Sequence, residues 1–134
     1  MNEKEAGEAI LSVLVVEDDA DAAETLAWLL RFYGHKVEVA RDGPTALRTV
    51  ENGSPDVVIL DLSLSDEMDG WEVARWMQQR THGRLPFLIA LTGNAEAEMR
   101  RRCFEDGIHL HLLKPVDPEF LKKLLNRFKD IICK

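Results

Sequence analysis

The chain has 134 residues, of which 46% are hydrophobic and 31% are charged. This length suits one domain with a buried core and excludes two domains of ordinary size. Lys and Arg number 17 against 24 Asp and Glu, which gives a net charge of −7. That charge argues against binding to DNA or RNA, because non-specific affinity for phosphates needs a basic surface. No apolar run approaches the roughly 18 residues of a membrane span, and the N-terminus lacks the pattern of a secretory signal.

The two cysteines, Cys103 and Cys133, can form at most one disulfide, and both stand among apolar helix positions. We therefore expect a protein of a reducing compartment, the cytoplasm. Residues 1–10 are polar, charged and without periodicity, and we expect them to form a loose leader. No repeat or low-complexity block divides residues 11–134, which we expect to fold as one domain.

After the leader, five short apolar runs alternate with five longer segments of helical periodicity. The predicted strands are residues 13–16, 36–40, 57–59, 87–91 and 108–113. The predicted helices are residues 21–33, 44–51, 71–80, 95–106 and a last one that begins at Pro118. Unbroken apolar runs are typical of strands that are covered on both faces. The order predicts a parallel sheet with right-handed crossovers and helices on both sides.

The side chains that can carry chemistry stand where the predicted strands end: Glu17, Asp18, Asp61, Thr92 and Lys114. In a doubly wound parallel sheet, the functional site lies beyond these carboxyl ends. Carboxylates that are brought together repel one another unless a cation joins them, and oxygen ligands of this kind suit Mg²⁺. A carboxylate can also attack phosphorus to form an acyl phosphate. A metal and a lysine would neutralise the phosphoryl charge in such a reaction.

Three other sites can be weighed against this interpretation. A dinucleotide site needs a glycine-rich turn after the first strand, whereas the turn here is acidic and would repel a pyrophosphate, which excludes that function. A phosphatase of the haloacid dehalogenase type uses a second Asp two residues after its nucleophile, where this chain has Ser63. His109 and His111 form an H-x-H pair, but no third ligand for zinc stands near them in sequence. Phosphoryl chemistry at the strand ends is the favoured hypothesis.

In this order and spacing, the strand-end residues resemble the receiver domain of two-component response regulators. The residues that carry the resemblance are Glu17-Asp18, Asp61, Thr92 and Lys114-Pro115. The resemblance extends over about residues 11–130. The resemblance implies an α/β fold of the flavodoxin-like type, a three-layer sandwich of five βα units with strand order 2-1-3-4-5. It also implies a signalling module and not an enzyme.

The resemblance further implies a role for each residue. Asp61 is the expected phosphoacceptor, and the donor is a histidine of a sensor kinase, a hybrid kinase or a histidine phosphotransfer protein. The expected ligands of Mg²⁺ are Glu17, Asp18, Asp61 and the backbone carbonyl of Ser63. Thr92 and Lys114 are expected to contact phosphoryl oxygens, and the peptide bond between Lys114 and Pro115 is expected to be cis.

Phosphorylation is expected to change a surface formed by the helix 95–106, the strand 108–113 and the last helix, where a downstream protein partner binds. The expected switch couples Thr92 to His111, which replaces the Tyr or Phe usual in this family. An equal alternative makes His111 a half-buried strand residue that bonds the backbone. Ser63 and Asn94 are expected to line the route of the attacking water and so to set the lifetime of the acyl phosphate.

The remaining features are interpreted as follows. The loop after Asp61 is one residue longer than is usual in receivers before a Met-Asp-Gly motif. Asp19 is interpreted as a helix cap rather than a metal ligand. The run 100–102, three arginines, forms either a solvated helix face or a docking patch, and Trp76 either packs on its helix flank or anchors an interface. The apolar stripe that ends at residues 131–132 serves the core, a homodimer or a neighbouring domain. For the chain as a whole, the alternative function is a receiver-fold interaction module that phosphorylation does not regulate.

Overall fold

The computed structural model describes residues 10–64, 68–80, 85–93 and 96–132. The expected leader, apart from its last residue, lies outside these ranges, as do Asn94 and Cys133. The described residues form five strands and five helices that alternate along the chain. Within these ranges, no helix has the length and apolar character needed to cross a membrane.

The strands form one parallel sheet in the order β2-β1-β3-β4-β5. Their bounds are β1 Ser12–Val16, β2 Lys36–Ala40, β3 Val57–Asp61, β4 Phe87–Thr92 and β5 Leu110–Leu113. All five residues of the central strand β3 are buried, whereas the edge strand β2 buries Ala40 alone. The order and direction of the strands confirm the predicted flavodoxin-like α/β fold.

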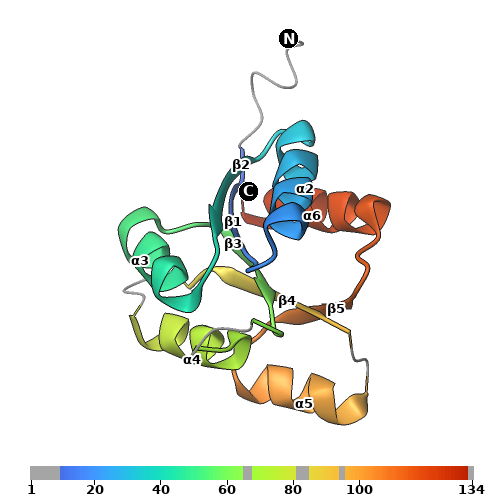
Figure 1. Cartoon of the computed structure of the whole chain (residues 1–134). Helices are drawn as coiled ribbons and strands as arrows, with labels where there is room; N and C mark the ends of the chain where they lie inside the picture. Colours follow the sequence, from blue (N-terminus) through green and yellow to red (C-terminus); the bar gives the residue numbers. More distant parts are fainter. Residues whose placement is uncertain (1–9, 65–67, 81–84, 94–95, 133–134) are drawn as a thin grey trace.

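The helices cover both faces of this sheet. Their bounds are α2 Ala20–Phe32, α3 Gly43–Gly53, α4 Gly70–Arg80, α5 Ala97–Glu105 and α6 Pro118–Ile132. Helices α2 and α6 lie on one face, and α3, α4 and α5 lie on the other (Figure 1). Because successive strand residues point to opposite faces, Ile59 belongs to the apolar core beneath α2 and α6 and Leu60 to the core beneath the other three helices.

The two ends of α2 follow from the local sequence. The Asp19 carboxylate accepts a hydrogen bond of 3.1 Å from the Ala22 N–H, so Asp19 is the N-cap, as predicted. At the other end, Gly34 has a φ of +99°, and the N–H groups of Gly34 and His35 donate to carbonyl oxygens of the last helical turn. This Schellman motif ends the helix and places His35 immediately before β2.

Most elements differ from the sequence prediction by one or two residues at one end or both. The helix expected over 95–106 spans Ala97–Glu105, and the last strand begins at Leu110 rather than at residue 108. His109 therefore lies before the strand, where its Nδ1 accepts a hydrogen bond of 2.9 Å from the Leu88 N–H. Because Nδ1 accepts this bond, the neutral ring carries its proton on Nε2, and neither nitrogen offers a free lone pair to zinc.

Candidate functional site

Three carboxylates meet at the carboxyl edge of the sheet. Glu17 and Asp18 follow β1 directly, and Asp61 is the last residue of β3. The register pairs Val16 with Leu60 on these neighbouring strands, which brings the residues that follow them together. One carboxylate oxygen of each acidic residue lies within 4.8 Å of the other two. In the described part of the chain, this is the cluster of potential ligands that could hold a metal ion.

Asp61 is 2% exposed, and its Oδ1 atom is surrounded by donors. The Lys114 Nζ lies 2.9 Å from Oδ1, and the N–H and hydroxyl of Ser63 donate to the same oxygen at 2.9 and 2.8 Å. Burial raises the pKa of Asp61, but hydrogen bonds with Glu17, Lys114 and Ser63 outweigh it and hold the pKa below its ordinary value of 3.8. Asp61 is therefore a buried, ionised carboxylate.

Burial and the crowding of these carboxylates raise the pKa of Glu17. It is 7% exposed, and burial together with the hydrogen bond to Asp61 raises the pKa of Glu17 from 4.5 to about 7. The Lys114 Nζ, 3.9 Å from Oε1 of Glu17, offsets this shift in part. Adjacent carboxyl groups do not both ionise readily without a cation between them. Three hard oxygen ligands in one small pocket therefore fit Mg²⁺.

The turn after β5 carries Lys114 into this pocket. The Lys114 N–H donates to the Thr92 carbonyl at 2.8 Å, and the peptide bond between Lys114 and Pro115 is cis, as expected. Thr92 ends β4, which pairs with β3 up to Asp61, and its side chain is buried. The structure thus places Thr92 and Lys114 at the same sheet edge as the three carboxylates.

His111 lies further from the edge. The register pairs His111 with Ala90 and Leu113 with Thr92, so the side chains of His111 and Thr92 lie on the same face of the sheet. Helix α5 covers this face. The roles of His111 as a switch and of the Ser63 carbonyl as a metal ligand stay predictions.

Two residues at this edge had not been singled out from the sequence. Arg41 follows β2 and donates two hydrogen bonds to the carbonyl oxygen of Asp18, at 3.1 and 2.6 Å. Gly70 begins α4, and a Cβ added to it would lie 2.6 Å from the Asp61 carbonyl oxygen and 2.6 Å from the Leu62 Cα. The Met-Asp-Gly motif could have drawn attention to Gly70. No signal pointed to Arg41, because its partner is 23 positions away.

A groove of about 760 Å³ opens beside the acidic pocket. Its charged lining comes from Glu17, Asp19, Asp21 and Lys114. Helix α2 and the segment after β5 supply most of its apolar lining: Ala22, Leu26, Leu29, Pro115, Val116 and Pro118. The groove thus joins the acidic pocket to an apolar surface.

The arginine run on α5 makes local contacts, and both the solvated helix face and the docking patch stay predictions. Arg101 lies 3.8 Å from Glu98 and 4.0 Å from Glu105 in ion pairs within the helix. The Arg102 guanidinium lies 4.1 Å from the centre of the Trp71 ring. These side chains are more than half exposed, as expected for a solvated helix face.

The family model for the response regulator receiver domain matches residues 13–126. Response regulator MprA of Mycobacterium sp. (strain KMS) is 36% identical over 120 residues, which are 90% of this chain and 50% of that protein. The chain thus spans about half the length of this relative.

Solved structures agree with the sequence match. The receiver domain of a sensor histidine kinase from Pseudomonas aeruginosa PAO1, which has a magnesium ion coordinated in its active site cleft, is 30% identical with a TM-score of 0.80, covering 91% of this chain and 99% of that one. Chemotaxis protein CheY4 of Vibrio cholerae is 30% identical with a TM-score of 0.79, covering 90% and 99%. Both likenesses extend over nearly the whole chain.

Proposed function

The chain belongs to the response regulator receiver family, and on that premise we propose that it is a phosphorylation-dependent switch of a two-component system with Asp61 as the phosphoacceptor. One observation carries the proposal: Asp61 is buried and ionised, with Lys114 2.9 Å from its Oδ1 and two further carboxylates beside it. We assign the receiver domain to residues 11–134 and its place of action to the cytoplasm.

The proposed reaction moves a phosphoryl group from a phosphohistidine to Asp61. A carboxylate oxygen of Asp61 forms a bond to phosphorus while the P–N bond breaks, and the histidine nitrogen keeps the electron pair. Lys114 and the Thr92 hydroxyl bind phosphoryl oxygens, and the Ser63 N–H orients the carboxylate. Mg²⁺, held by Glu17, Asp18, Asp61 and the Ser63 carbonyl, would neutralise the charge on the phosphoryl oxygens.

The groove along α2 supports a protein as the phosphodonor. It is largely apolar, and it shares Glu17 and Lys114 with the acidic pocket. A histidine that reaches Asp61 can therefore belong to a protein whose neighbouring apolar side chains pack in the groove. We assign this position to a sensor or hybrid histidine kinase, or to a histidine phosphotransfer protein.

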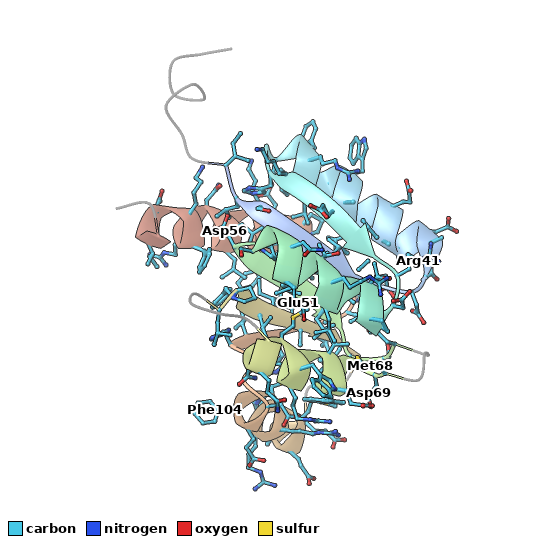
Figure 2. The ribbon with its side chains drawn as sticks, turned by 90° about the vertical axis from the view of Figure 1, so that its left-hand side faces the viewer. Arg41, Glu51, Asp56, Met68, Asp69 and Phe104 are labelled. Atoms are coloured by element: carbon cyan, nitrogen blue, oxygen red, sulfur yellow. The ribbon has the colours of Figure 1, made fainter. Side chains whose placement is uncertain are left out.

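The proposed output surface consists of α5, β5 and α6. Phosphorylation adds a charge of about −1.5 to −2 at the pocket, and Thr92 and His111 transmit the change to this surface. Large apolar side chains are exposed on it, among them Phe104 at 83%, Leu113 and Phe120. Figure 2 shows the Phe104 ring projecting away from α5. Exposed aromatic side chains of this kind suit the binding of a downstream protein.

Acetyl phosphate and intact-mass measurement test this function. With Mg²⁺, we expect the wild-type chain to gain one phosphoryl group and Asp61→Asn to gain none. Asp56→Asn is the matched control, because Asp56 precedes the same strand at the opposite edge of the sheet, and it should be labelled like the wild type. Labelling of Asp61→Asn at the wild-type rate would refute the assignment. A wild-type chain that takes no label under these conditions would favour the interaction module instead.

A further inference from the structure

Arg41 contacts the acidic pocket from a part of the chain that the proposed reaction does not use. Its Nε and Nη2 donate to the carbonyl oxygen of Asp18 at 3.1 and 2.6 Å. The backbone around Arg41 is held on both sides: the Ala40 carbonyl accepts a hydrogen bond of 3.0 Å from the Glu17 N–H, and Asp42 caps α3. Figure 2 shows Arg41 at the end of the molecule where α2 and α3 begin.

The carbonyl that Arg41 binds belongs to the peptide group between Asp18 and Asp19. The N–H of this same peptide group donates to Oε2 of Glu17 at 3.3 Å. Because a peptide group is planar, an interaction that fixes its carbonyl oxygen also fixes the direction of its N–H. A guanidinium on the carbonyl also polarises the group and strengthens the hydrogen bond that its N–H donates.

Both acidic residues of this turn therefore depend on one peptide plane. Two of the three carboxylates that lie within 4.8 Å of one another come from Glu17 and Asp18. A rotation of the peptide group would release the Glu17 carboxylate from its N–H donor and turn the backbone that carries the Asp18 side chain.

We propose that Arg41 is a positioning residue for the divalent-cation site, and that it orients the carboxylates of Glu17 and Asp18 by holding the peptide group between Asp18 and Asp19. The inference rests on the proposed function, because that function requires Mg²⁺ in this pocket. Arg41 is not itself a metal ligand, but it would arrange the ligands before the ion binds.

Calorimetric titration with Mg²⁺, without any phosphodonor, tests the proposal. Arg41→Met keeps much of the side-chain length and removes both donors, and we expect the Kd for Mg²⁺ to rise about tenfold. Arg41→Lys keeps the charge with a different donor geometry and should recover part of this loss. Arg48→Met is the matched control: Arg48 is an exposed arginine of α3 that donates to Thr45 Oγ1 at 3.2 Å, and its loss removes the same charge.

A second readout reports the peptide group directly. In the metal-free protein, Arg41→Met should move the amide proton resonance of Asp19 upfield, because the hydrogen bond to Glu17 weakens. The same resonance should stay in place in Arg48→Met. Melting temperatures of the metal-free variants should agree with the wild type within about 2 °C, because substitutions at exposed sites change stability little.

The outcomes separate the inference from the proposed function. If the wild type binds Mg²⁺ and Arg41→Met binds it equally well, the positioning role is wrong and the proposed function stands. If Arg48→Met weakens binding as much as Arg41→Met, net charge explains the effect and the positioning role is again wrong. A wild-type chain that binds no Mg²⁺ overturns this inference together with the metal site of the proposed function.

Discussion

The carboxyl and amino edges of the sheet both bury ionisable side chains, but the surroundings of these side chains differ. At the carboxyl edge, Glu17 and Asp61 contact each other and Lys114, so the protonation of one group depends on the others. At the amino edge, His35 is 7% exposed, and neither ring nitrogen has a hydrogen-bond partner among the described residues. Coupling between charged groups, rather than burial alone, therefore distinguishes the candidate site.

Burial favours the neutral form of the ionisable side chain at both edges, but the free energy of unfolding then changes with pH in opposite directions. It raises the pKa of Glu17 to about 7. Burial, with a smaller contribution from Lys129, lowers the pKa of His35 below its ordinary value of 6.5. The free energy of unfolding therefore falls with rising pH on account of Glu17, and with falling pH on account of His35. A bound cation can relieve the first loss but not the second.

Glycine-to-alanine substitutions should give the largest difference in the free energy of unfolding between the two edges. Gly70→Ala places a Cβ 2.6 Å from the backbone of Asp61 and Leu62, and we expect it to lower the free energy of unfolding by about 3 kcal/mol. Gly53, which ends α3 near the amino edge, has open space around an added Cβ, so Gly53→Ala should be neutral within about 0.5 kcal/mol. Urea unfolding measures both changes. Equal losses would show that the close approach at Gly70 does not matter.

Glu17→Gln should raise the stability of the metal-free protein at alkaline pH. Because the pKa of Glu17 is about 7 in the native state against 4.5 ordinarily, the native state binds this proton more tightly than the unfolded state. The wild type therefore loses stability as the pH rises from 4.5 to about 7, and the variant does not. We expect a difference of about 3 kcal/mol near pH 8.

Urea unfolding across this pH range, with a chelator and then with Mg²⁺, checks the change at Glu17. The curves of variant and wild type should meet below pH 4.5, where the carboxyl is protonated in both states. Mg²⁺ should stabilise the wild type more than Glu17→Gln, which lacks one carboxylate ligand. Parallel curves in the chelator would mean that Glu17 titrates as an ordinary carboxyl group.

His35→Leu should have the smallest effect and the opposite pH dependence. The residue after the Schellman glycine commonly packs against the preceding helix turn, so we expect Leu to fit there. It also removes two buried nitrogens that have no hydrogen-bond partner among the described residues. We expect a gain of about 1 kcal/mol at neutral pH. The gain should grow as the pH falls below 6.5, because the unfolded state of the wild type then takes up a proton that buried His35 resists.

Thermal unfolding between neutral and mildly acidic pH tests the role of His35. Burial also lowers the pKa of His109, but His109 is present in both proteins, so their difference reports His35. If His35→Leu and the wild type lose stability equally on acidification, another group is responsible.

Most of the fold and much of the site were predictable, for a local reason. The unbroken apolar run before Asp61 indicated a buried strand, and Asp19 before an apolar helical stripe indicated a cap. In a parallel sheet all carboxyl ends of the strands lie at one edge. The sequence therefore predicted that Glu17, Asp61 and Lys114 lie close together. The start of the last strand was placed two residues early, because Ile108 is a buried apolar residue that extends the pattern, whereas the ladder begins at Leu110.

Periodicity and turn residues depend on neighbours in the chain, so the sequence by itself determined the elements, their order and the edge where the acidic residues meet. Other features depend on distances between side chains from separate elements. These are the raised pKa of Glu17, the contact of Lys114 with Oδ1 of Asp61 and the bond from Arg41 to a peptide 23 positions away. Only the packing of β2, β3 and β5 against β1 and β4 sets those distances, and so only the tertiary structure decided how the pocket is charged.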